Sequence, residues 1–254
     1  MKNRKIILSI VVASIFIALI AAMSYIPFLG YITIGTISFT TIHIVVLIGA
    51  MLFGKWFGLG FGTVFGFFSF LAALQKPGMV DFLFVNPFVS ILPRAAFGFL
   101  AGLTFDIFRK RMKLAQFLEF SATFAGFLTI LHSILTLLCL YVFGYLDIFR
   151  IEKAIGASEI ISALDGVFGS FMNFLVVFVA LGTAVETLAA VVIVPLAGGG
   201  LYKVFANSDF TRTGLITIAE ESKISKNKVI ILLSGVGTLV LAFVIAAFVL
   251  YFVH

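Results

Sequence analysis

Residues 120–146 read FSATFAGFLTILHSILTLLCLYVFGYL, a run of twenty-seven residues without Asp, Glu, Lys or Arg. A helix of about 20 apolar residues crosses the roughly 30 Å hydrocarbon core of a bilayer, so this run is long enough to span it. Backbone polar groups in lipid must be paired within the segment, and the run lacks the two-residue alternation of a barrel strand. The stretch therefore predicts a transmembrane helix.

Composition extends this prediction to the whole chain. Hydrophobic residues account for 62% of its 254 residues and charged residues for 11%. The hydrophobic share is higher and the charged share lower than in typical soluble domains. The net charge of +6 would by itself suit nucleic-acid binding, but no soluble domain is predicted that could present a basic face. The fold class is therefore all-α integral membrane, and the lipid bilayer is the solvent for most of its surface.

Apolar segments of helical length divide the chain into a bundle of six transmembrane helices and one additional helix. The six helices are predicted at residues 6–23, 41–53, 57–74, 87–108, 120–146 and 176–205. The domains follow as a six-helix membrane domain over 1–206, a cytoplasmic linker over 207–228 and an extra C-terminal transmembrane helix within 229–254. The weakly apolar segment from Gly30 to Thr41 is predicted to be a loop that dips into the bundle or lies along the interface.

The apolar stretch over residues 166–202 is too long for one crossing and tight for two. The number of its crossings decides on which side of the membrane the C-terminus lies. Cytoplasmic loops collect Lys and Arg, and a single crossing places thirteen of the seventeen basic residues on one side. These are Lys2, Arg4, Lys5, Lys55, Arg109, Lys110, Arg111, Lys113, Lys203, Arg212, Lys223, Lys226 and Lys228. We therefore prefer one crossing, with the N-terminus in the cytoplasm and the C-terminus outside.

Arg94 is the most informative single residue, because a charge within an uncharged apolar stretch is costly unless it meets a counter-ion, a cavity or a ligand. Pro93 precedes it and removes a backbone N–H, so a kink is expected there. Arg94 is interpreted either as an anion-binding guanidinium in a water-filled cavity or as half of a structural ion pair with Glu186 or Asp106. The sequence leaves both interpretations open.

Glu186 is the matching exception in the last segment of the bundle. An acid there must be protonated, paired or facing water, and it could bind a ligand hydroxyl, amine or ring nitrogen, or pair with Arg94. His43 and His132 also interrupt apolar segments, where a lone histidine is more often a hydrogen-bonded core residue than a ligand. With one histidine in each segment and Cys139 as the single cysteine, we predict no metal site, no disulfide and no cofactor.

Catalytic motifs are absent from the sequence, which has no Gly-Lys-Ser/Thr phosphate loop, no His-Glu-x-x-His and no Gly-x-Ser-x-Gly. We therefore predict that the chain is not an enzyme and that any ATP-driven motor lies on another chain. Small residues at close spacing indicate helix contacts instead. The glycines of residues 57–74 are expected to pack within the bundle, whereas Ser9 and Ala13 on the first helix offer a surface for a partner.

Several motifs that follow one another along residues 5–205 carry a family resemblance. They are Thr41 to Gly54 with His43 and Gly49, then Gly58, Gly62, Phe65-Gly66 and Ser69, then Asn86-Pro87 to Ser90 and Pro93-Arg94, and finally Gly126, Thr129, His132 and Glu186 to Pro195. In this order and spacing they resemble the substrate-binding S component of energy-coupling factor (ECF) vitamin transporters.

The resemblance implies a vitamin pocket that opens outward, built from helices 4 to 6 and the loops after helices 1 and 3. It also implies docking on a transmembrane scaffold subunit that carries two ATPases, a toppling motion during transport, and a plasma-membrane location, which we expect to be that of a Gram-positive bacterium. The predicted substrate-binding residues are Arg94, Asn86, His132, Glu186 and Phe82. The predicted docking residues are Ser9 and Ala13.

Within this family, the Asn-Pro and Pro-Arg pattern with an intramembrane arginine is nearest to the branch that includes pantothenate binders. Pantothenate carries a carboxylate and hydroxyls that suit these side chains, while pyridoxine, a pyrimidine, folate and cobalamin stay open as substrates. Two features depart from the family, namely Val45 in place of a usual proline and the extra C-terminal helix. A self-sufficient proton-coupled carrier that uses Glu186 and Arg94 is the main rival function, and a purely structural membrane protein is a weaker one.

Overall fold

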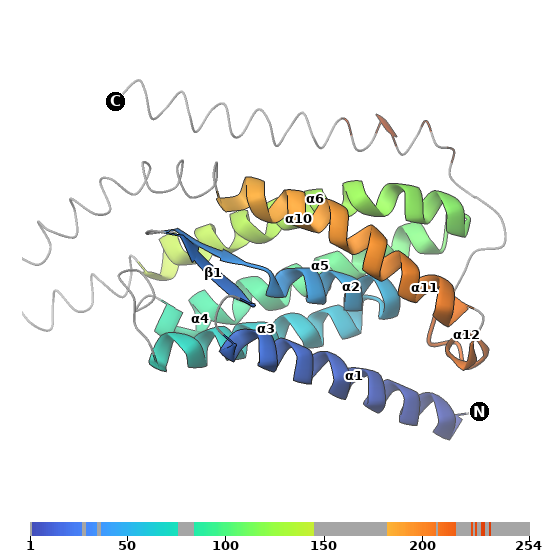
Figure 1. Cartoon of the computed structure of the whole chain (residues 1–254), viewed down its shortest axis with the longest axis horizontal. Coiled ribbons are helices and arrows are strands. Elements are labelled where there is room, and N and C mark those ends of the chain that lie inside the picture. Colours follow the sequence, from blue (N-terminus) through green and yellow to red (C-terminus); the bar gives the residue numbers. More distant parts are fainter. Residues whose placement is uncertain are drawn as a thin grey trace, which may run out of the picture.

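The computed structural model describes residues 2–26, 29–34, 37–75, 84–144, 182–206 and 208–216, together with the isolated positions 225, 227, 230, 231 and 234. The first elements are α1 (Lys2–Tyr25), β1 (Tyr31–Ile34), β2 (Ile37–Thr40), α2 (Ile42–Phe53) and α3 (Lys55–Gln75). They are followed by α4 (Pro87–Ser90), α5 (Leu92–Arg109), α6 (Leu114–Cys139), α10 (Ala184–Ile193), α11 (Gly199–Ala206) and α12 (Asp209–Arg212). Long helices pack side by side in one bundle (Figure 1), which confirms the predicted all-α membrane fold.

Five helices of the described residues are long and apolar enough to cross a membrane: Asn3–Tyr25, Lys55–Gln75, Pro87–Arg109, Leu114–Cys139 and Ala184–Phe205. Helix α2 is shorter, with 12 residues and a length of about 18 Å at the rise of an α-helix. Every residue of α2 is buried. A fully buried short helix forms the centre of the bundle, and the longer helices surround it.

Helix boundaries differ from the prediction where polar residues extend a helix beyond its apolar run. Helix α6 begins at Leu114, before the charged Glu119, and continues as a π-helical turn over Leu140–Gly144. The predicted helix over 87–108 is interrupted at Ile91, which separates α4 from α5. Helices α10 and α11 are joined by a π-helical turn over Val194–Gly198 that contains Pro195, as expected where proline lacks a backbone donor.

Two parts of the predicted topology lie outside the described residues. The additional helix over 229–253, of which only positions 230, 231 and 234 are described, is one, and the loop and helix start within 145–181 are the other. The number of crossings before Ala184 and the side on which the C-terminus lies therefore stay predictions.

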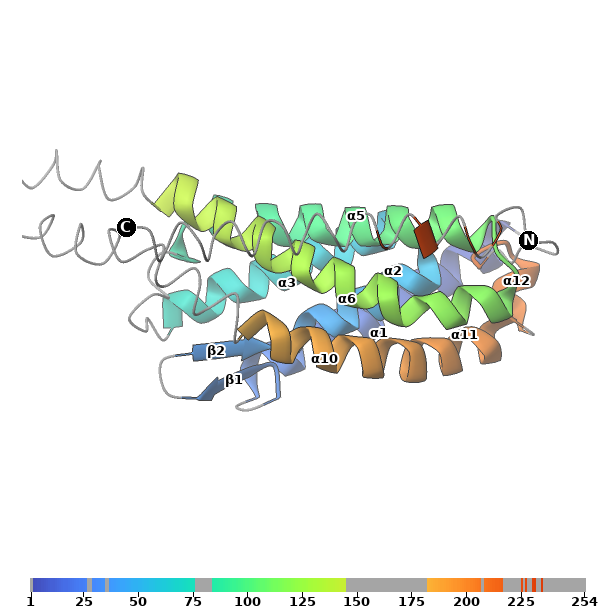
Figure 2. The same cartoon turned by 90° about the horizontal axis from the view of Figure 1, so that it is seen from above.

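The segment predicted as a loop between Gly30 and Thr41 is instead an antiparallel hairpin. Strand β1 pairs with β2, with Tyr31 opposite Thr40 and Ile34 opposite Ile37. Both strands are rich in β-branched and aromatic residues, a composition that favours strands. With four residues each, they are too short to be recognised as strands in a sequence dominated by apolar helices. The hairpin and α4 lie at one end of the bundle, opposite α12 and the N-terminus (Figure 2).

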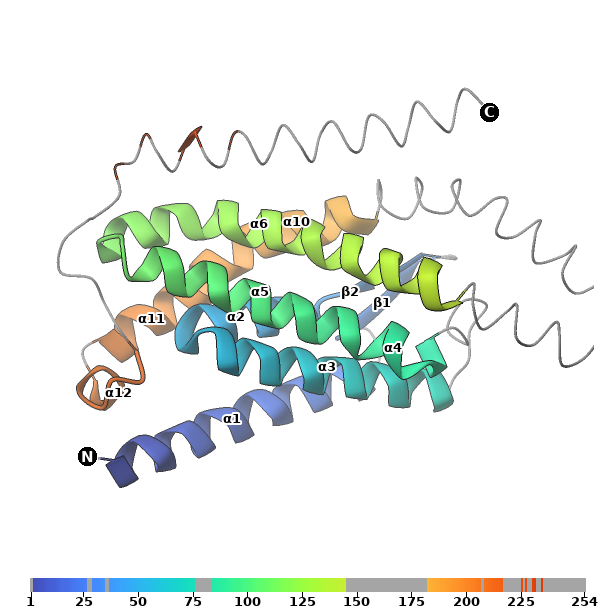
Figure 3. The same ribbon diagram turned by 180° about the vertical axis from the view of Figure 1, so that it is seen from behind.

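Helix α1 runs along one edge of the bundle (Figure 3) and exposes most of its apolar surface. Ile6, Ile7, Ile10 and Ile15 are between 50% and 60% exposed, a degree of exposure that is normal for residues facing lipid tails. Its buried face holds Val12 and other residues that pack on the core.

Helices α3 and α5 meet along a line of glycines, where their backbones touch without intervening side chains. A Cβ atom on Gly58 would lie 2.2 Å from the Gly98 carbonyl oxygen, and one on Gly62 would lie 2.1 Å from the Arg94 carbonyl oxygen. The packing role predicted for the glycines of this helix is thus confirmed for Gly58 and Gly62. It is wrong for Gly60, which is exposed and has no heavy atom within 4 Å of its Cβ position.

Gly62→Ala should therefore destabilise the protein by about 1 to 3 kcal/mol, because the added methyl group must push two backbones apart. Gly60→Ala, on the same helix, should leave stability unchanged or raise it by up to about 1 kcal/mol through its higher helix propensity. Reversible unfolding in mixed detergent micelles measures both. Equal effects of the two substitutions would contradict the described contact between α3 and α5.

Candidate functional site

Arg94 lies where the chain is interrupted between α4 and α5. Asn86 caps α4, its side-chain oxygen accepting a hydrogen bond from the Phe88 N–H at 2.9 Å, and Pro87 fills the first turn. Pro93 has no N–H to offer to the carbonyl of Val89, four residues earlier. The Arg94 guanidinium takes this role, since Nη1 donates to the carbonyls of Val89 at 3.2 Å and Ser90 at 2.8 Å.

Only part of the Arg94 guanidinium is used in this way. The residue is 5% exposed, and the rings of Phe65 and Phe84 lie 5.1 Å from its central carbon. Its Nε has no hydrogen-bond partner among the described residues. Arg94 therefore stabilises the helix break on one side and keeps an unused charged donor on the other.

The ion pair that the sequence left open for Arg94 is not formed within the described part of the chain. Glu186 instead accepts a hydrogen bond from the backbone N–H of Thr40 at 2.7 Å, and Asp106 pairs with Arg109. The contact between Glu186 and Thr40 joins helix α10 to the end of the hairpin. Glu186 thus positions the hairpin next to the helix bundle.

Two histidines stack in the interior of the bundle, His43 from α2 and His132 from α6. Their ring centroids are 5.6 Å apart and their planes differ by 11°. The Phe97 ring lies 4.7 Å from His132, and the Phe65 ring lies 5.8 Å from it. Phe65 therefore contacts both His132 and the Arg94 guanidinium.

Polar atoms in this region are buried without partners among the described residues. They are Oγ1 of Thr40, both ring nitrogens of His43, Nε of Arg94, both ring nitrogens of His132, and Oγ1 of Thr136 and Thr187. Most buried polar atoms in proteins are hydrogen-bonded, and each unpaired one costs about 1 to 3 kcal/mol. We call these six residues the polar cluster.

The polar cluster draws on five elements that are far apart in sequence. Thr40 ends β2, and His43 and Arg94 lie in the first turns of α2 and α5. His132 and Thr136 lie one turn apart on α6, and Thr187 lies on α10 beside Glu186. The stack of His43 on His132, the Phe65 ring beside His132 and Arg94, and the hydrogen bond from Thr40 to Glu186 link these elements to one another. The arrangement is therefore suited to a polar ligand of moderate size, bound through one cationic donor and several neutral donors and acceptors.

The structure brings together three of the five predicted substrate residues. Arg94 and His132 belong to the polar cluster and Glu186 bonds to the backbone of Thr40, whereas the side-chain oxygen of Asn86 caps α4 and Phe82 lies outside the described residues. Sequence reasoning assigned His43 to the core and missed Thr40, Thr136 and Thr187. The signal that identifies His43 is a histidine within a short helix whose every residue is buried.

The predicted docking residues Ser9 and Ala13 are both partly buried on α1. Ala13 packs against the hydrophobic core, and neighbouring isoleucines occupy the most exposed face of the helix. Within the described residues, no group of three or more His, Cys, Asp or Glu side chains is placed to hold a metal ion.

A second charged cluster lies at the opposite end of α5. Arg109 is 4% exposed, and its Nη1 donates to the Leu52 carbonyl at 2.6 Å and the Met51 carbonyl at 3.4 Å. Its Nη2 donates to Oδ1 of Asp106 at 2.5 Å, while Oδ2 of Asp106 accepts from the Lys55 N–H at 3.0 Å. This pair joins the end of α2, the start of α3 and α5.

Comparisons of the sequence with known proteins give two matches that bear on the family. The model of the family described as "ECF transporter, substrate-specific component" matches residues 8–198. The pantothenate transporter PanT of Leuconostoc mesenteroides subsp. mesenteroides is 32% identical to the chain over 102 residues, which cover 38% of this chain and 50% of that protein. The chain thus matches about half the length of this curated relative.

Proposed function

The chain belongs to the family of ECF transporter substrate-specific components, and from this premise we propose that it binds pantothenate and delivers it to an energy-coupling complex. The observation that carries the proposal is the buried Arg94 guanidinium, which keeps an unpaired donor beside the polar cluster. Membership of a transporter family accords with the prediction that the chain is not an enzyme.

The chemistry of pantothenate matches the donors and acceptors of the site. A carboxylate suits a guanidinium in a site away from water, where charge-assisted hydrogen bonds are strongest. Hydroxyl and amide groups suit the neutral side chains of the polar cluster, each of which can donate or accept. The relative named as a pantothenate transporter supports the same choice.

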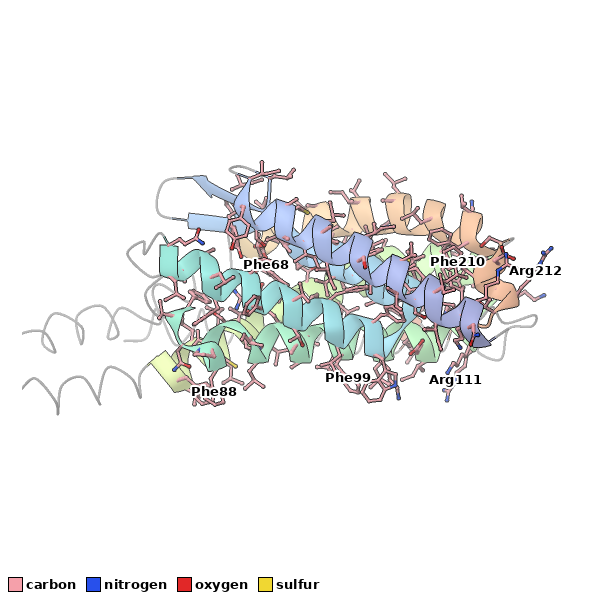
Figure 4. The ribbon with its side chains drawn as sticks, turned by 90° about the horizontal axis from the view of Figure 1, so that it is seen from below. Phe68, Phe88, Phe99, Arg111, Phe210 and Arg212 are labelled. Atoms are coloured by element: carbon pink, nitrogen blue, oxygen red, sulfur yellow. The ribbon has the colours of Figure 1, made fainter. Side chains whose placement is uncertain are left out.

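We propose that the energy for uptake comes from other subunits. In this proposal, the chain docks on a transmembrane scaffold subunit with two ATPases and topples to carry the bound vitamin across a plasma membrane, that of a Gram-positive bacterium. In Figure 4 the side chains of Arg111 and Arg212 extend outward at the end of the bundle where α1 begins, whereas Phe88 lies at the other end. The rule that basic residues stay inside supports a cytoplasmic N-terminus, with the hairpin end facing outward. The C-terminus is proposed to lie outside.

Purified alone, the protein should bind pantothenate at a ratio of one to one, as measured by titration calorimetry, and native mass spectrometry should identify it as a copurified ligand. Reconstituted alone in vesicles, the protein should not accumulate the vitamin with or without a proton gradient. Pyridoxine, hydroxymethylpyrimidine, folate and cobalamin serve as comparison ligands. Tighter binding of one of them would correct the substrate, and proton-driven accumulation would identify a self-sufficient carrier instead.

Helix α1 is proposed to dock on the scaffold subunit through Ser9 and Ala13. Ser9→Trp combined with Ala13→Trp should abolish copurification with the scaffold and the ATPases while pantothenate binding stays within about 3-fold of the original. Ala22→Trp, an exposed position at the other end of α1, is the matched control and should still assemble. If the double variant is monodisperse and still assembles, the docking surface lies elsewhere.

A further inference from the structure

Helix α2 places one polar side chain, His43, in the centre of the bundle. All twelve residues of α2 are buried, and His43 is 0% exposed. The other side chains of this helix are apolar, so His43 is the one position where α2 presents a hydrogen-bonding side chain to the centre of the bundle.

Neither ring nitrogen of His43 has a hydrogen-bond partner among the described residues. The backbone of Thr40 lies near the ring but forms no hydrogen bond with it. His132, the residue stacked on His43, has two unpaired nitrogens as well. The two rings therefore offer four hydrogen-bonding atoms in one place, and stacked rings cannot satisfy one another.

The position of the pair relative to Arg94 indicates what it can bind. Phe65 lies 5.1 Å from the central carbon of the Arg94 guanidinium and 5.8 Å from the His132 ring. Arg94 and His132 therefore both lie against the same Phe65 ring. A neutral imidazole donates one hydrogen bond and accepts one, as a hydroxyl group does, so the two groups are complementary.

We propose that His43 is a substrate-contacting residue and that, with His132, it binds the hydroxyl groups of the substrate while Arg94 binds its carboxylate. This inference rests on the proposed function and deepens it. It extends the site to helix α2, and it makes His43 a determinant of specificity for hydroxylated substrates. A ligand with the same carboxylate but no hydroxyls would keep its contact with Arg94 and lose only its contacts with the histidine pair.

Two ligands and two substitutions at His43 test the proposal by titration calorimetry on the full-length protein. The ligands are pantothenate and N-(3,3-dimethylbutanoyl)-β-alanine, which keeps the carboxylate and the amide but lacks both hydroxyls. The affinity of the original protein for pantothenate should be at least about 10-fold higher than its affinity for the analogue. His43→Phe keeps a ring that can stack on His132 but removes both nitrogens. It should weaken pantothenate binding about 10-fold and leave the affinity for the analogue within about 3-fold.

His43→Gln, which restores a donor and an acceptor, should recover a preference for pantothenate. Ile48→Val, a loss of packing farther along α2, should change neither affinity and is the matched control. His43→Leu takes the place of His43→Phe if that variant is not monodisperse. If His43→Phe weakens binding of both ligands equally, or leaves the affinity for pantothenate unchanged, the role of His43 is overturned while the proposed function stands. A lack of pantothenate binding by the original protein would overturn the proposed function and this inference with it.

Discussion

Arg94→Ala should weaken pantothenate binding roughly 10- to 100-fold, the largest effect on affinity that we expect from any single substitution. A charge-assisted contact between a guanidinium and a carboxylate in a buried site contributes on the order of 1.5 to 3 kcal/mol, which corresponds to this range. The unpaired Nε of Arg94 is the donor that the structure leaves for such a contact. Titration calorimetry with pantothenate measures the change.

The same substitution should also reduce stability, because Arg94 bonds to the carbonyls of Val89 and Ser90 at the break between α4 and α5. Arg94→Lys separates the two roles. A lysine ammonium can still donate to backbone carbonyls, but it lacks the planar fork that binds a carboxylate. We therefore expect Arg94→Lys to recover most of the thermal stability and little of the affinity. Recovery of both would show that the planar guanidinium is not needed for binding.

A double substitution tests the structural alternative. If Arg94 and Glu186 formed a buried ion pair, Arg94→Met with Glu186→Met would restore the stability that either single change removes. The structure places the Glu186 carboxylate on the Thr40 N–H instead, so the two losses should add. Rescue in the double variant would contradict the described contacts.

Arg109→Ala should cause the largest loss of stability, about 3 to 5 kcal/mol, because it leaves the Asp106 carboxylate without its buried partner. It also removes the donor to the carbonyls at the end of α2. Arg111→Ala provides a matched control, since Arg111 is exposed two residues farther on and should change stability by less than about 0.5 kcal/mol. Reversible unfolding in mixed micelles measures both, and similar effects would rule out the role of the pair.

Sequence reasoning predicts the helices of this protein well because hydrocarbon imposes a simple requirement on length and polarity. The apolar runs that form α3 and α6 are recognisable in the sequence, and Pro93 predicts an interruption of the helix near the start of α5. Helix ends are less predictable, as α6 shows, because the polar residues of its first turns continue the same hydrogen-bonded helix. The hairpin was missed because strand pairing depends on a partner segment and not on local apolarity.

Only those site residues could be predicted whose charge alone makes their transfer into lipid unfavourable in free energy. Arg94 and Glu186 stand out by charge, but their actual partners are backbone groups of Ser90 and Thr40, which no pattern of side chains reveals. His43 appears in the sequence as an ordinary core histidine. Its importance depends on the stack with His132, 89 residues farther along the chain, and such a contact exists only in the folded bundle.

The glycine contacts between α3 and α5 also limit how this protein can move. Helices that slide past each other do so by exchanging side-chain rotamers at their interface, and two backbones in direct contact have none to exchange. The backbones meet at Gly58 with Gly98 and at Gly62 with Arg94, and Gly66 of α3 meets Ile91 just before α5. Helices α3 and α5 should therefore behave as a single rigid plate. Any large motion must carry this plate as one body, and the bending must occur in the segments that connect it to the rest of the bundle.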